Sequence, residues 1–140
     1  MADHLTLEYE FKNDPKDDFG WLIIKAEGKG FAGLSGFWVQ WQDVVEWSVE
    51  IQQFPLPATG IDAEWGYRQD GQYHQVIHIG LYQCSDAGRI FARLRLRDYY
   101  DSNFKAEFGF ETCYANLQIF SKEVGLMMAK ASRQATLHAD

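Results

Sequence analysis

Three groups of residues in this sequence have types and spacings that could support chemistry. Residues 28–33 read GKGFAG, a literal match to the GxGxxG pattern that binds a dinucleotide pyrophosphate. His74 and His78 stand four positions apart, which would place both on one helix face for binding a metal ion. Asp62 and Glu64 form a carboxylate pair of the kind that glycosidases use. Each chemistry also needs a particular structural element around these residues.

The predicted elements do not meet these needs. A dinucleotide site requires a helix after the glycines, whereas residues 37–41 are aromatic and β-like, so we expect a hairpin turn at residues 28–33. His74 and His78 fall near an alternating strand pattern, where a four-residue separation spans roughly 13 Å. No apolar pocket is predicted that would raise the pKa of one carboxyl group of the Asp62 and Glu64 pair. We therefore expect no catalytic residue, no metal ion and no cofactor.

The acidic residues are concentrated in the first half of the chain. Residues 1–70 hold 13 of the 20 Asp and Glu but only 5 of the 13 Lys and Arg, and the formal net charge is −7. A surface of one sign attracts partners of opposite charge and repels nucleic acid and anionic membranes. This asymmetry predicts a basic protein partner, no nucleic acid and no membrane.

Length and composition predict one folded domain covering residues 1–140. The chain is 46% hydrophobic and 16% aromatic, which excludes disorder and favours a β-rich core. Its longest apolar runs are a handful of residues, and its N-terminal segment has no signal-peptide pattern. We therefore expect a cytoplasmic protein in which Cys84 and Cys113 are buried, reduced thiols.

The hydrophobic pattern predicts an α+β fold with a mainly antiparallel sheet of about seven strands and two helices, in the order βββ-α-ββββ-α. Period-two alternation or short apolar runs mark the expected strands, and period-3.6 stripes mark helices near 43–54 and 112–131. The strands are expected at residues 5–11, 21–24, 37–41, 61–68, 76–81, 90–97 and 104–111. Asp70–Gly71 is a favoured hairpin turn, and residues beyond Ser132 are expected to fray.

The first helix carries the main candidate binding residues. Asp43 is expected to cap it, with Glu46 completing a capping box, and an apolar stripe follows from Val44 at i+3, i+7 and i+10. Because that stripe must pack on the sheet, Asp43, Glu46 and Glu50 are left on a solvated flank. We expect this flank to bind the partner, although it could equally serve only to solubilise the domain.

Two further charged groups are candidates. Asp14, Asp17 and Asp18 lie in a predicted turn at residues 13–18 that lacks the pattern of a calcium loop, and they form a second acidic patch for the partner. Arg95, between two other alternating arginines, is expected opposite Glu107 in a hairpin. This arginine ladder is interpreted as structural, with an anion or RNA-phosphate site as the alternative.

Two segments resemble the small bacterial immunity proteins of the WapI type, which belong to polymorphic toxin systems. Residues 31–54 read FAGLSGFWVQWQDVVEWSVEIQQF, and residues 108–127 read FGFETCYANLQIFSKEVGLM. In that family a glycine-rich strand leads into a helix that begins near an acidic residue, and a closing strand and helix carry an F-x-F-x-T pattern. The resemblance spans about residues 19–130, rests mostly on core aromatics and turn glycines, and implies no catalytic residue.

The sequence therefore predicts a non-enzymatic protein-binding module, an immunity protein that neutralises a basic toxin domain by masking it. Complementary charge would speed association, and a few central aromatic residues would prolong the complex. Two alternatives stay open. One is a small-ligand binder or enzyme with an aromatic-lined pocket, and the other is a homodimeric scaffold that pairs through the apolar run at residues 21–24.

Overall fold

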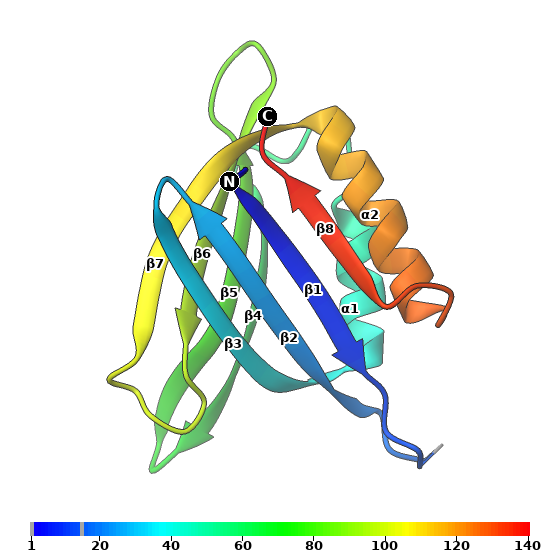
Figure 1. Cartoon of the computed structure of the whole chain (residues 1–140), viewed down its shortest axis with the longest axis vertical. Helices are drawn as coiled ribbons and strands as arrows, with labels where there is room; N and C mark the ends of the chain where they lie inside the picture. The colour runs from blue at the N-terminus through cyan, green and yellow to red at the C-terminus, as the bar shows by residue number, and fades with distance from the viewer. Residues whose placement is uncertain (1, 15) are drawn as a thin grey trace.

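The structure is a computed structural model that describes residues 2–14 and 16–140. It contains two four-stranded antiparallel sheets and two helices (Figure 1). The first sheet has the strand order β3-β2-β1-β8 and the second has the order β4-β5-β6-β7. In chain order the elements are β1 His4–Glu10, β2 Phe19–Gly28, β3 Phe31–Gln40, α1 Trp41–Glu50, β4 Ile61–Gln69, β5 Gln72–Gln83, β6 Arg89–Arg97, β7 Lys105–Cys113, α2 Tyr114–Met128 and β8 Gln134–His138. The predicted α+β class is confirmed.

The two sheets and two helices enclose one core. Figure 1 shows the first sheet crossing in front of the second, with α2 alongside β8 and α1 behind it. Strand β3 contacts β5, β6 and β7, whereas α2 contacts β8 and β1 and packs on α1. One half of the first sheet therefore covers the second sheet, and the other half covers the helices. Buried side chains from both sheets and both helices meet between these layers, among them Leu7, Ile24, Ile79, Leu94 and Phe120.

The C-terminal segment corrects the sequence prediction of a frayed end. Residues 134–138 form β8, which pairs antiparallel with β1 along its length. Ala135 and Leu137 alternate with polar residues and are fully buried. The hydroxyl groups of Thr6 and Thr136 form a 3.0 Å hydrogen bond across the strand pair. This short strand completes the first sheet and gives α2 an apolar surface to pack on.

Two tight hairpins contain the glycines that the sequence placed in turns. Lys29 and Gly30 have positive φ angles of 51° and 87° and join β2 directly to β3. Residues 28–33 thus form a hairpin followed by a strand, and the helix that a dinucleotide site requires does not follow them. Asp70 and Gly71 also have positive φ angles and join β4 to β5, which confirms the predicted turn.

The second sheet is a four-stranded meander whose last hairpin has the predicted register. Arg95 lies directly opposite Glu107, and the Arg95 Nε is 3.2 Å from a Glu107 carboxylate oxygen. The pairing expected from alternation alone is confirmed. Between β4 and β5 the register shifts at Trp65/Gly66, which marks a β-bulge.

Strand β2 and the two cysteines have partly open environments. Strand β2 is central in its sheet, but no element in the described part of the chain covers its outer face (Figure 1), where Trp21 and Ile23 stay half-buried. Both cysteines are free, but Cys84 is exposed and Cys113 is only half-buried, so the prediction of buried thiols is wrong. Among the described residues, no helix is long and apolar enough to cross a membrane.

Candidate functional site

The predicted acidic flank of α1 lines one side of a surface groove. Asp43, Glu46 and Glu50 all border this groove, which has a volume of about 220 Å³. Asp62 and Glu64 of β4 border it as well, so five carboxylates from two elements surround one hollow. We call this hollow the acidic groove. The sequence had grouped the first three residues, and the structure adds the second pair to them.

The apolar stripe of α1 is buried, as predicted, and leaves the acidic flank exposed. The helix begins at Trp41, two residues before the predicted start. Val44, Trp47 and Ile51 are buried, which leaves Asp43 exposed beside them. The N-cap position is Gln40 and has no side-chain capping bond, so the capping role predicted for Asp43 and Glu46 is wrong. The helix follows β3 without a loop, and its first N–H donates to the backbone carbonyl of Asp18 at 3.0 Å. Asp43 lies instead in the first turn, where a negative charge is favourable.

The two β4 carboxylates are held by neighbours on β5. His78 Nε2 lies 2.9 Å from Asp62 Oδ1, and the Gln75 side-chain amide donates to Glu64. These contacts fix the carboxylates at the edge of the second sheet. Asp62 and Glu64 share one strand face because they are two positions apart, and these contacts give each a structural partner.

A second, aromatic groove of about 250 Å³ adjoins the acidic groove. The two grooves share Asp43 and Trp65 as lining residues. The aromatic groove is also lined by Phe19, Trp38 and Tyr99, which come from β2, from β3 and from the loop after β6. It lies where the β3 edge of the first sheet meets the β4 edge of the second. The site is therefore a continuous surface, carboxylate-rich at one end and aromatic at the other.

One aromatic ring of this groove already contacts a cation. The Lys12 ammonium lies 4.6 Å from the centre of the Trp38 ring and 3.0 Å from an Asp17 carboxylate oxygen. Trp38 also makes an edge contact with Trp21 at 4.9 Å, which fixes the orientation of its ring. Indole faces attract ammonium and guanidinium groups, and neighbouring carboxylates add to this attraction. The surface is suited to Lys and Arg side chains.

In the second predicted acidic patch, two of the carboxylates accept hydrogen bonds from backbone N–H groups two residues later in the chain. Pro15, which belongs to the predicted turn, lies outside the described residues. Asp14 accepts a hydrogen bond from the Lys16 N–H, and Asp17 accepts one from the Phe19 N–H, each at 2.9 Å. The Phe19 bond and Lys12 together lower the pKa of Asp17. Asp18 is exposed, and its backbone meets the start of α1. The two acidic patches thus approach each other at the aromatic groove, although the first two aspartates also stabilise the loop.

The histidines do not converge. His74 stacks on Tyr67, with ring centres 5.0 Å apart, and His78 pairs with Asp62. The bulge between them places the two rings in separate environments. Within residues 2–14 and 16–140 no group of three or more His, Cys, Asp or Glu side chains could hold a metal ion.

The aromatic groove was not predicted from the sequence. Phe19, Trp38, Trp65 and Tyr99 belong to four separate segments, so no local spacing connects them. The one available signal is that Phe19 and Trp38 lie on the strand face that alternation leaves outside the core.

Comparison of the sequence with models of known protein families and with curated proteins gave no match. The resemblance of residues 31–54 and 108–127 to WapI-type immunity proteins therefore stays a prediction.

Proposed function

We propose that this protein is a non-enzymatic binding module that captures a basic protein through the acidic and aromatic grooves. The observation that carries the proposal is that five carboxylates and the aromatic groove form one continuous surface, joined at Asp43 and Trp65. In this proposal the carboxylates steer the partner, and rings such as Trp38 hold it once docked.

The carboxylates of the α1 flank are not neutralised by ion pairs within the described part of the fold. Asp43, Glu46 and Glu50 are exposed and form none of the ion pairs found in the described part of the chain. Carboxylates crowded in one groove repel one another, and a cationic partner would relieve that repulsion. This arrangement favours a protein rich in Lys and Arg over an anionic partner such as nucleic acid.

The specific assignment that we propose is an immunity protein, acting in the cytoplasm, that masks the active surface of a basic toxin domain. It rests on the resemblance to WapI-type proteins and on the charge of the groove. The alternative of a small-ligand binder or enzyme with an aromatic-lined pocket has less support, because the aromatic groove measures about 250 Å³. Typical small-molecule sites span roughly 300–1,000 Å³.

The test is an inhibition assay with a defined partner. If the gene next to this one encodes a large secreted protein that ends in a small basic domain, that domain should be purified and mixed with this chain. We expect a one-to-one complex and loss of the domain's toxicity in cells that co-express this protein. A basic neighbouring domain that neither binds this chain nor is inhibited by it would contradict the immunity assignment.

A homodimer is a second candidate, favoured by the uncovered outer face of the first sheet. Leu34 is 67% exposed and Trp38 38% exposed, and both lie on this face with the half-buried Trp21 and Ile23. Two copies could bury this apolar surface against each other. Sedimentation should then show a dimer that Leu34→Lys converts to a monomer, whereas a monomeric wild-type protein at high concentration would exclude it.

A further inference from the structure

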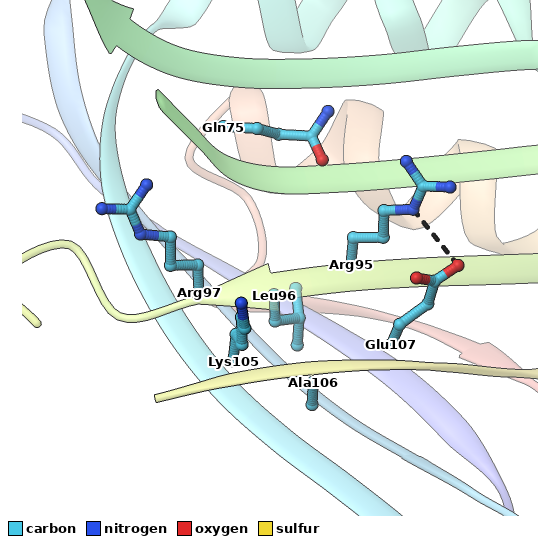
Figure 2. A pocket seen from close by; sticks show the side chains of 7 residues that line it. All are labelled: Gln75, Arg95, Leu96, Arg97, Lys105, Ala106 and Glu107. Atoms are coloured by element: carbon cyan, nitrogen blue, oxygen red, sulfur yellow. Dashed lines mark ion pairs between the residues drawn. The ribbon is translucent and has the colours of Figure 1, made fainter. Parts of the chain in front are cut away.

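A third groove, of about 410 Å³, lies on the outer face of the second sheet near the β6–β7 hairpin (Figure 2). Unlike the acidic groove, it is lined by three cations, Arg95, Arg97 and Lys105. Glu107 is the one carboxylate among its lining residues. In a chain with a net charge of −7, this is a local concentration of positive charge.

One ion pair forms among the groove residues, and the other two cations have no carboxylate partner in the described part of the chain. Figure 2 shows Arg95 turned toward Glu107, with 3.2 Å between the paired atoms. Among the described residues, neither Arg97 nor Lys105 has a carboxylate within ion-pair distance. In the adjoining loop, Asp98 is occupied by the backbone N–H groups of Tyr100 and Asp101.

The two unbalanced cations stand directly opposite each other. Arg97 and Lys105 are register partners in the β6–β7 pair. Like charges at directly opposite positions destabilise a strand pair, and an anion bound beside both would relieve that repulsion. Two residues further along each strand, the register partners Arg95 and Glu107 carry opposite charges and attract each other.

Two hydrogen bonds hold Arg97 in place, and some of its N–H donors have no partner in the described part of the chain. Its backbone carbonyl accepts the Ser35 hydroxyl at 2.6 Å, and its Nη1 donates to His74 Nδ1 at 3.3 Å. Its Nε is buried and has no hydrogen-bond partner in the described part of the chain. A guanidinium carries five N–H donors, so the His74 contact leaves most of them without a partner in the described part of the chain.

From this arrangement we infer that the groove binds a phosphate group. The Arg97 guanidinium can donate to phosphate oxygens through the N–H groups of its two Nη atoms that His74 does not use, and Lys105 adds a point charge from the neighbouring strand. Gln75 borders the same groove and already donates its side-chain amide to Glu64. The groove volume of about 410 Å³ leaves room for the organic part of a small phosphorylated molecule. This inference does not depend on the proposed binding of a basic protein.

The test is calorimetric titration with inorganic phosphate, pyrophosphate and a nucleoside monophosphate at constant ionic strength. We expect saturable one-to-one binding, weakened about tenfold or more in Lys105→Gln and in Arg97→Gln, because each loses a charged hydrogen bond. The matched control is Arg93→Gln, which removes the same charge from the same strand outside the groove. Its affinity should stay within about twofold of wild type.

Relative affinity for the three probes identifies the source of the phosphate. Equal affinity for inorganic phosphate and the nucleotide indicates the free anion, and tighter nucleotide binding indicates a phosphorylated metabolite. The inference is overturned if the wild-type protein binds none of the probes saturably, or if Arg93→Gln weakens binding as much as Lys105→Gln. Saturable binding of single-stranded RNA without binding of any probe would also overturn it. Lys105 is exposed, so Lys105→Gln keeps the test decisive even if Arg97→Gln fails to fold.

Discussion

The Tyr9 hydroxyl marks the point where the two predicted acidic patches come together. It donates to the Val39 carbonyl at 2.7 Å, and Tyr9 is 8% exposed. Burial, with a smaller contribution from the charges of Asp17, Asp43 and Asp18, raises the pKa of Tyr9 to about 12. The phenol therefore lies close enough to carboxylates of both acidic patches for their charges to act on it.

This pKa shift predicts a loss of stability at alkaline pH. The unfolded phenol ionises near pH 10, before the folded one, so the stabilisation is complete below pH 10 and is lost as pH rises toward 12. The full loss should be about 2–3 kcal/mol. Tyr9→Phe should be less stable than wild type by about 1–3 kcal/mol at pH 8, because the Val39 carbonyl loses its donor.

Urea denaturation of both proteins from pH 8 to pH 11.5 checks this expectation. Ionisations common to both proteins cancel in the difference between their free energies of unfolding. That difference should narrow above pH 10. A difference that stays constant over the whole range would show that Tyr9 ionises as it does in the unfolded chain.

The Arg95 and Glu107 pair should contribute little to stability. Its side chains are 48% and 54% exposed, and such solvated pairs contribute roughly 0–1 kcal/mol. The charge-swapped double variant R95E/E107R should unfold within about 1 kcal/mol of wild type. Arg95→Glu alone should cost more, because it places two negative charges opposite each other. A double-mutant cycle measures both effects, and a cost of several kcal/mol for the swap would contradict this assignment.

At the scale of elements, β8 is the largest departure from the sequence prediction. Its five residues contain two apolar side chains, and its partner β1 lies at the opposite end of the chain. Propensity and periodicity report local order, whereas this strand is stabilised by a non-local pairing. The same limit applies to the aromatic groove. By contrast, the Arg95 and Glu107 register was predictable because a short loop joins two clearly alternating strands.

If β8 completes the core, Leu137→Ala should be costly. Leu137 in β8 is fully buried, and truncating such a leucine typically costs about 2–5 kcal/mol of folding free energy. Gln134→Ala on the same strand is exposed and should change stability by less than about 0.5 kcal/mol. Equal stability of the two variants in urea denaturation would mean that the C-terminal segment is frayed in solution.

The aromatic groove depends on two sheet edges that meet, and Trp38 is its most exposed indole. Trp38→Ala should raise the dissociation rate of a bound basic partner about tenfold or more, as buried aromatic anchors do, with little change in association rate. Leu34→Ala is the matched control, because it lies on the same face of β3 outside the groove. Surface plasmon resonance separates the two rates, and an equal effect of the two substitutions would remove Trp38 from the site.

At the scale of the whole molecule, charge is segregated in space as well as in sequence. The carboxylates of α1 and β4 gather in one groove, while Arg97 and Lys105 gather near the β6–β7 hairpin. A hollow lined with one sign of charge focuses the electric field and raises the encounter rate with an oppositely charged partner. The acidic groove should therefore act mainly on the association rate of a basic partner, and this effect should weaken as ionic strength rises.

The most direct test measures the association rate of the basic partner with Glu50→Lys. Glu50 is exposed at the end of α1, where a cation is tolerated, so the melting temperature should barely change. The matched control is Glu8→Lys, an exposed carboxylate on β1 outside the groove. At low salt, Glu50→Lys should slow association by roughly threefold to tenfold, and the defect should shrink toward 0.5 M salt. An unchanged association rate at low salt, or an equal defect in Glu8→Lys, would show that the α1 flank is only a solvated surface.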